Sequence, residues 1–88
     1  MKKIVTVTEV AGEGIESLLG ERVLIFCMNY IYTGILVGVN QTCVKLEKAK
    51  IAFETGDFSK PGYTDAQALP GDSWYVQVSS IESFGLGK

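Results

Sequence analysis

The sequence contains no histidine. Without an imidazole, neither a Ser-His nor a Cys-His nucleophile pair can form. The glycines do not follow the GxGxxG or GxxxxGK spacing of phosphate-binding loops, and Asp57, Asp65 and Asp72 do not follow the spacing of a calcium loop. We therefore expect a protein that is not an enzyme and that binds no metal and no cofactor.

Cysteine and long apolar runs are also scarce. Cys27 and Cys43 lie inside apolar runs without CxxC spacing, which favours two reduced, buried thiols over the alternative of a disulfide. No apolar run approaches the ~20 residues of a membrane helix. The start, "MKKIVTVTEVAGEGIE", lacks the apolar core of a signal peptide. We expect a cytoplasmic protein with no membrane contact.

Positive charge is in the minority. The sequence has eight Lys and Arg residues and ten Asp and Glu residues, which gives a net charge of −2. A general nucleic-acid coat depends on many phosphate contacts, so this balance argues against such a coat and still allows a local basic patch. The chain has 88 residues, of which 47% are hydrophobic. This length allows one domain, residues 1–88, and its apolar content predicts association with copies of itself.

The pattern of residues predicts one short helix followed by β-strands. Ile15, Leu18 and Leu19 fall on one helical face before Gly20, which predicts a helix over about 12–19. The runs that follow are rich in β-branched and aromatic residues, which is typical of strands. The five predicted strands lie in "RVLIFCMN", in "YIYTGILVGVN", in "TCVKLEKAKIAFET", and on either side of Ser79-Ser80 in "WYVQVSSIESFGL".

The third strand changes the parity of its apolar residues at Glu47-Lys48. Even positions are apolar before this point and odd positions after it: Val44 and Leu46, then Ala49, Ile51 and Phe53. A β-bulge at Glu47-Lys48 would let both halves of a bent strand face one core. Gly34 and Gly38 in the second strand also predict a bend or a close backbone approach.

Residues 55–73 form a long loop between the third and fourth strands, since they contain both prolines and little periodicity. Within it, "TDAQAL" predicts a brief helical turn. The predicted fold is mainly all-β: a small, strongly bent, five-stranded antiparallel barrel with a short N-terminal helix. Such a barrel has two different exposed edges, so pairing between copies would be heterologous and would close into a ring.

Several of these segments resemble the Sm/LSm proteins. Gly20-Glu21-Arg22-Val23-Leu24-Ile25, then Gly34-x-Leu36-x-Gly38-Val39-Asn40 and "VKLEKAKI", resemble the family's first motif, and "YVQVSSIESF" resembles the second. The resemblance covers about 12–54 and 74–86, and it places the long loop where the family has a variable one. It implies an SH3-like/Sm-like barrel whose fourth and fifth strands pair between subunits. It also implies a ring that binds single-stranded RNA around its pore.

The chain is a divergent match to this family. Asn40-Gln41-Thr42-Cys43 stands where members that bind uridine-rich RNA have an acidic residue, an aromatic residue and an asparagine. Ser79-Ser80 stands where the second motif has Arg-Gly. The main hypothesis is a homo-oligomeric ring that binds single-stranded RNA or DNA in nucleic-acid processing, without catalysis. The alternative is a structural or protein-assembly ring that has lost RNA binding.

Two groups of residues are candidate sites. The polar turns and two strand lysines are expected to contact nucleic acid through neutral hydrogen bonds and phosphates. The alternative is that tight turns prefer Asn and Thr, and that the lysines block stray edge pairing. The predicted nucleic-acid-binding residues are Asn40, Gln41, Thr42, Ser79, Ser80, Lys48 and Lys50. The predicted subunit-interface residues are Trp74, Tyr75, Val76, Val78, Ile81 and Phe84.

Overall fold

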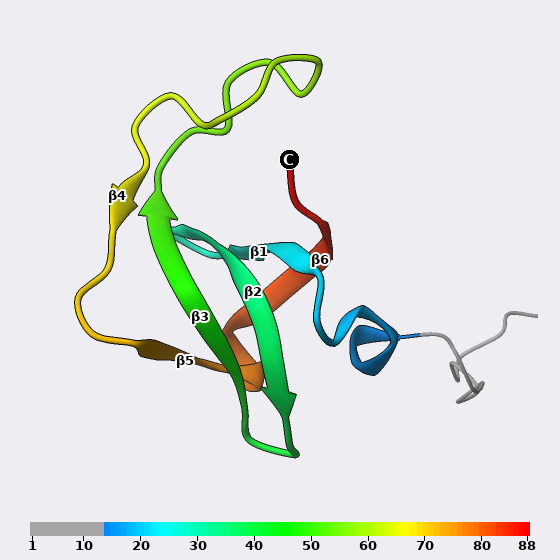
Figure 1. Ribbon diagram of the computed structural model, residues 1–88. Helices are drawn as coiled ribbons and strands as arrows, with labels where there is room; N and C mark the ends of the chain where they lie inside the picture. Colours follow the sequence, from blue (N-terminus) through cyan, green and yellow to red (C-terminus); the bar gives the residue numbers. More distant parts are fainter. Residues whose placement is uncertain (1–13) are drawn as a thin grey trace, which may run out of the picture.

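The computed structural model describes residues 14–88 as a mainly antiparallel β-sheet that bends around one core (Figure 1). A 3-10 helix, η1 (Ile15–Leu18), comes first. The strands are β1 (Arg22–Cys27), β2 (Ile31–Val39), β3 (Cys43–Ala52), β4 (Gln67–Ala68), β5 (Ser73–Gln77) and β6 (Ile81–Leu86), with a second 3-10 helix, η2 (Val78–Ser80), before β6. The sheet order is β4-β3-β2-β1-β6, and β5 also pairs with β3.

The predicted bulge in the third strand is present. Thr33 pairs with Lys50 and Ile35 pairs with Glu47, so two residues of β3 lie opposite Gly34 alone. Lys48, the first of these two, has a φ of 52°. One extra residue reverses which side chains face inward, and Val44, Leu46 and Ala49 are accordingly all buried.

Phe53 was predicted to face the core together with Ala49 and Ile51. This prediction is wrong. The side chain of Phe53 is 62% exposed and lies against the ring of Tyr30, with 5.1 Å between centroids. The backbone leaves the sheet here, because the Phe53 amide donates to both carboxylate oxygens of Asp65 at 3.0 and 3.1 Å. Ala52 is the last buried residue of β3.

The predicted N-terminal helix is reduced to one 3-10 turn. Residues 12 and 13 of the prediction lie outside the described residues, and only Ile15–Leu18 are helical. Gly14 and Gly20 have φ values of 82° and 86°, in the left-handed region that interrupts a helix at either end. Ile15 and Leu18 still pack against the core, whereas Leu19, the third residue of the predicted apolar face, follows η1 and is 48% exposed.

The long segment after β3 contains a strand where a helical turn was predicted. Gln67 and Ala68 pair with Ile51 and Lys50 as β4, and the Leu69 amide donates to the carbonyl of Ala49 at 2.9 Å. The described chain therefore has six strands rather than five. Leu69 packs against the core, which explains why this segment lies along β3.

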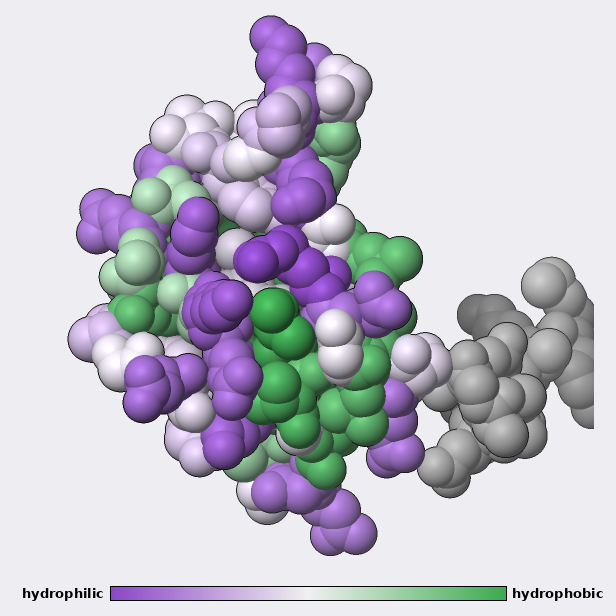
Figure 2. Space-filling model, viewed as in Figure 1, coloured by the Kyte–Doolittle hydropathy of each residue, from purple (hydrophilic) through white to green (hydrophobic). Residues whose placement is uncertain are grey.

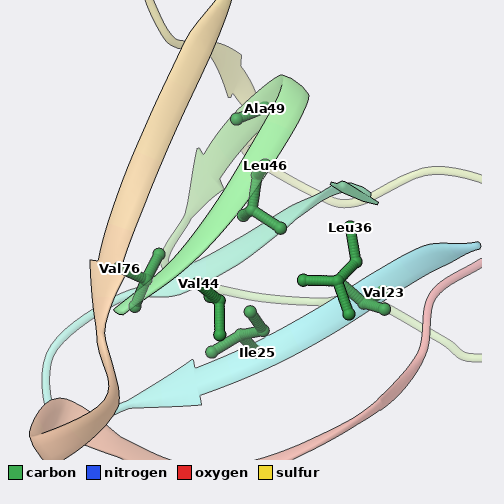
Figure 3. Packing of buried hydrophobic residues seen from close by; sticks show 7 residues of the cluster. All are labelled: Val23, Ile25, Leu36, Val44, Leu46, Ala49 and Val76. Carbon is green, nitrogen blue, oxygen red and sulfur yellow. The ribbon is translucent and has the colours of Figure 1, made fainter. Parts of the chain in front are cut away.

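The core lies between β1, β2, β3 and β5 (Figure 3). Thr33 is its buried polar residue, and its hydroxyl donates to the carbonyl of Val23 at 2.8 Å, as a buried polar group requires. No helix among the described residues is long and apolar enough to cross a membrane. The buried apolar cluster is Val23, Ile25, Leu36, Val44, Leu46, Ala49 and Val76.

Hydrophobic side chains also gather on one outer face. In Figure 2 they lie over β2 and beside η1, with hydrophilic side chains around them. Leu19, which follows η1, is 48% exposed, and Val37 of β2 is 38% exposed. Val37 is the extra residue of a second bulge, because Leu36 pairs with Leu46 and Gly38 with Lys45.

Candidate nucleic-acid interface

The structure brings the two predicted polar turns together. The β2–β3 turn spans 40–42, and η2 follows β5. Because Cys43 pairs with Gln77 in the antiparallel ladder of β3 and β5, the start of β3 meets the end of β5. The amide of Val78 then donates to the carbonyl of Thr42 at 2.9 Å, which fixes one turn against the other.

A surface hollow of about 580 Å³ lies where these turns meet. We call it the turn hollow. Its lining is uncharged and consists mostly of side chains that both donate and accept hydrogen bonds. The lining residues are Gln41, Thr42, Cys43, Tyr75, Gln77 and Ser79.

Asn40 has a structural role next to this hollow. Its Oδ1 atom accepts hydrogen bonds from the Thr42 amide at 2.7 Å, from the Thr42 hydroxyl at 3.0 Å and from the Cys43 amide at 2.9 Å. This is an Asx-turn, in which the side chain stands in for a backbone carbonyl. The oxygen of Asn40 therefore shapes the turn, and Gln41 and Thr42 are the residues of the turn that face the hollow.

Asn40→Ala is expected to lower the free energy of unfolding by about 1 kcal/mol, since two turn amides lose their acceptor. Asn40→Asp is the matched control, because a carboxylate accepts the same hydrogen bonds and should leave stability almost unchanged. Thermal unfolding at one fixed protein concentration tests this pair, with an expected drop in Tm of about 4–8 °C for the alanine variant alone. Equal Tm values for wild type and Asn40→Ala would show that the Asx-turn is not needed.

The remaining predicted binding residues lie elsewhere. Ser80 lines a different hollow. Lys48 and Lys50 are exposed on the far half of β3 and line neither hollow. At ~3.3 Å per residue along a strand, Lys48 is about 20 Å from Thr42. The structure therefore brings together Gln41, Thr42 and Ser79 but not these two lysines.

Three residues of this region were not predicted to contact a ligand. Cys43 and Gln77 line the turn hollow, and Tyr75, which was predicted at the subunit interface, lines it as well. Lys45 lies beside them, with its ammonium 6.0 Å from the centroid of the Tyr75 ring. Only the register of β3 with β5, which the structure provides, places residues 43 and 45 opposite 77 and 75.

The residues predicted at the subunit interface differ in how deeply they are buried. Tyr75, Val78 and Phe84 are exposed, Trp74 and Ile81 are half-buried against the core, and Val76 is buried at 4% exposure. The side chain of Val76 therefore packs in the core of its own chain. Among the described strands, β5 pairs only with β3, and β6 pairs only with β1. Each of these two strands thus keeps one unpaired backbone edge.

A second hollow, of about 630 Å³, lies between the β1–β2 turn and the β5–β6 connection. Its lining includes the aromatic side chains of Tyr30, Tyr32 and Trp74, and also Tyr75, which lines the turn hollow as well. Cys27 lies there too. Burial, and secondarily the nearby carboxylate of Glu82, raises the pKa of the Cys27 thiol, so this thiol stays protonated at neutral pH. Cys27 and Cys43 are both free and half-buried.

Comparisons of the chain with models of protein families, with curated proteins and with solved structures found no significant match. Within residues 14–88, no three His, Cys, Asp or Glu side chains are grouped as metal ligands. The lining of the turn hollow combines one tyrosine with uncharged side chains, which can donate and accept hydrogen bonds.

Proposed function

We propose that this protein is a divergent Sm-like protein that assembles into a homo-oligomeric ring and binds single-stranded RNA or DNA without catalysis. The observation that carries the proposal is the turn hollow, in which Gln41 and Thr42 of one turn meet Ser79 of the other. Neutral donors and acceptors in such a hollow can contact base edges and phosphates. Repetition around a ring would multiply weak contacts into useful affinity.

The strand arrangement supports the Sm-like part of the proposal. β6 pairs with β1 while β5 pairs with β3, and the bulged β3 bends between β2 and β5. This is the arrangement expected of a small, partly open barrel. The unpaired edges of β5 and β6 are available for pairing with a second copy. Phe84 of β6, 43% exposed, and Val78, 39% exposed, would become buried in such a contact.

The direct test measures binding and mass together. Short uridine-rich, adenine-rich and random single strands are titrated against the purified protein at low and physiological salt. Its mass in solution is determined by light scattering. We expect binding at low salt that weakens as salt rises, and a mass of several chains. No binding at low salt would contradict nucleic-acid recognition, and a monomeric mass would contradict the ring.

Gln41→Ala is expected to weaken binding about 2- to 10-fold per subunit contact, since one hydrogen bond is worth about 0.5–1.5 kcal/mol. Gln41 is exposed in the turn, so its removal should leave folding intact. Gln67→Ala is the matched control, because this exposed glutamine lies on β4 beside Ile51, away from the turn hollow. Fluorescence anisotropy with a labelled strand compares the two. If both variants bind the labelled strand with equal affinity, the turn hollow is not part of the binding site.

One observation favours a second candidate, a ring that serves protein assembly and has lost RNA binding. The protein carries a net charge of −2, and the lining of the turn hollow contains no charged side chain. Phosphate contacts supply much of the affinity for nucleic acid. If the protein forms a multimer in solution but binds no single-stranded RNA or DNA at low salt, this second candidate is the correct one.

A further inference from the structure

The outer face of β5 presents two side chains next to the turn hollow. Val76 points into the core at 4% exposure, whereas Tyr75, its neighbour along the strand, is 60% exposed. Successive side chains of a strand point to opposite faces, so Gln77 shares the outer face with Tyr75. Across the ladder these two lie opposite Lys45 and Cys43. The result is an exposed aromatic ring on the wall of a hollow whose lining side chains are all uncharged.

Lys45 gives this face a local positive charge. Its ammonium lies 6.0 Å from the centroid of the Tyr75 ring, at the limit of a cation–π contact. On its other side Lys45 pairs with Gly38, where an added Cβ would lie 3.4 Å from the Cβ of Lys45. Gly38 has no side chain, so no side chain of β2 lies against Lys45 at this pairing.

We propose that Tyr75 is a platform on which a base of the bound strand stacks, and that Lys45 contacts the adjoining phosphate. This rests on the proposed binding of single-stranded nucleic acid, and it adds the groups that would supply most of the affinity. An exposed aromatic ring stacks any base, and a flanking lysine complements a phosphate. Gln41, Gln77 and Ser79 then contact base edges through amide and hydroxyl groups that both donate and accept.

The same geometry defines the preferred ligand. Stacking on one ring depends on the overlap of the two ring systems, and the larger purine bases overlap more than pyrimidines do. The side chains that line the turn hollow with Tyr75 carry no charge, so the hollow itself rejects no base by charge. Adenine-rich strands should therefore bind more tightly than uridine-rich strands of equal length.

This assignment is compatible with ring assembly through the strand edges. Edge pairing uses the backbone of β5, within the plane of the sheet, whereas Tyr75 and Gln77 project from its outer face. A neighbouring strand would extend the sheet beside β5 and leave that face open. Tyr75 is thus reassigned from the subunit interface to the ligand site.

The test compares Tyr75→Ala with Tyr75→Phe, using short oligo(A) and oligo(U) as probes and light scattering to follow the mass of each variant. Tyr75→Ala is expected to weaken oligo(A) binding roughly 5- to 150-fold, as the loss of one stacked base per site requires. Tyr75→Phe keeps the ring and should bind as wild type does. Lys45→Gln should reduce the slope of log affinity against log salt concentration by about 0.7 for each lost phosphate contact.

The outcomes separate this inference from the proposed function. If wild type binds neither probe at low salt, the proposed function fails as well. If wild type binds but Tyr75→Ala binds equally well, or if oligo(U) is preferred, only the stacking platform is refuted. If Tyr75→Ala lowers the mass in solution along with binding, Tyr75 belongs to the subunit interface and the inference is wrong. Loss of binding at unchanged mass, restored in Tyr75→Phe, supports it.

Discussion

Gly34→Val is expected to lower the free energy of unfolding by about 3 kcal/mol, and Gly34→Ala by about 1–3 kcal/mol. A Cβ atom at this position would lie 3.0 Å from the carbonyl oxygen of Glu47, 3.2 Å from the Cα of Ala49 and 3.2 Å from the Cβ of Leu46. Two of these atoms belong to the backbone of the bulge, so they cannot move away without changing the pairing of β2 with β3. Urea denaturation at fixed protein concentration measures the loss.

Gly38→Ala is the matched control in the same strand. An added Cβ there meets only side-chain atoms of Lys45, at 3.4 and 4.0 Å, and this exposed end of the sheet can adjust. We expect a change near zero, or a gain of up to about 1 kcal/mol, because alanine loses less conformational entropy on folding than glycine. Equal destabilisation by Gly34→Ala and Gly38→Ala would contradict the close approach at the bulge.

The bulge is the feature that was best predicted from sequence, for a physical reason. An apolar run whose parity reverses can face one core only if a residue is inserted, and the reversal at Glu47-Lys48 coincides with the positive φ of Lys48. Gly34 lies directly opposite. Phe53 was predicted wrongly because parity does not indicate where a strand ends, and β3 ends at Ala52 through the bonds from Phe53 and Glu54 amides to Asp65.

The residues that line the candidate site could be recognised from the sequence only in part. The two turns are recognisable as polar interruptions between strands, and antiparallel pairing of β3 with β5 brings them together. The face of Tyr75 could not be derived from "WYVQV", because this run is apolar on both parities except at Gln77. Whether Tyr75 or Trp74 points outward depends on the register with β3. The weak strand β4, of two residues, has no pattern of its own and forms because β3 offers an edge.

Leu46→Ala is expected to have the largest effect on stability, a loss of about 2–5 kcal/mol. Leu46 is 0% exposed and pairs with Leu36 of β2 and with Trp74 of β5, so its removal leaves a cavity between three strands. A domain of this size has only about 5–10 kcal/mol in total. The loss should appear in denaturant midpoints and should also loosen β5, increasing hydrogen exchange at its amides.

Phe53→Ala is the control that tests the register of β3. Phe53 directly follows β3, and its side chain is larger than that of Leu46. It is nevertheless 62% exposed and contacts Tyr30. Its expected cost is only about 0.5–1.5 kcal/mol. Comparable losses for the two variants would place Phe53 in the core and contradict the end of β3 at Ala52. If Leu46→Ala alone destabilises, the core position of Leu46 and the end of β3 at Ala52 both stand.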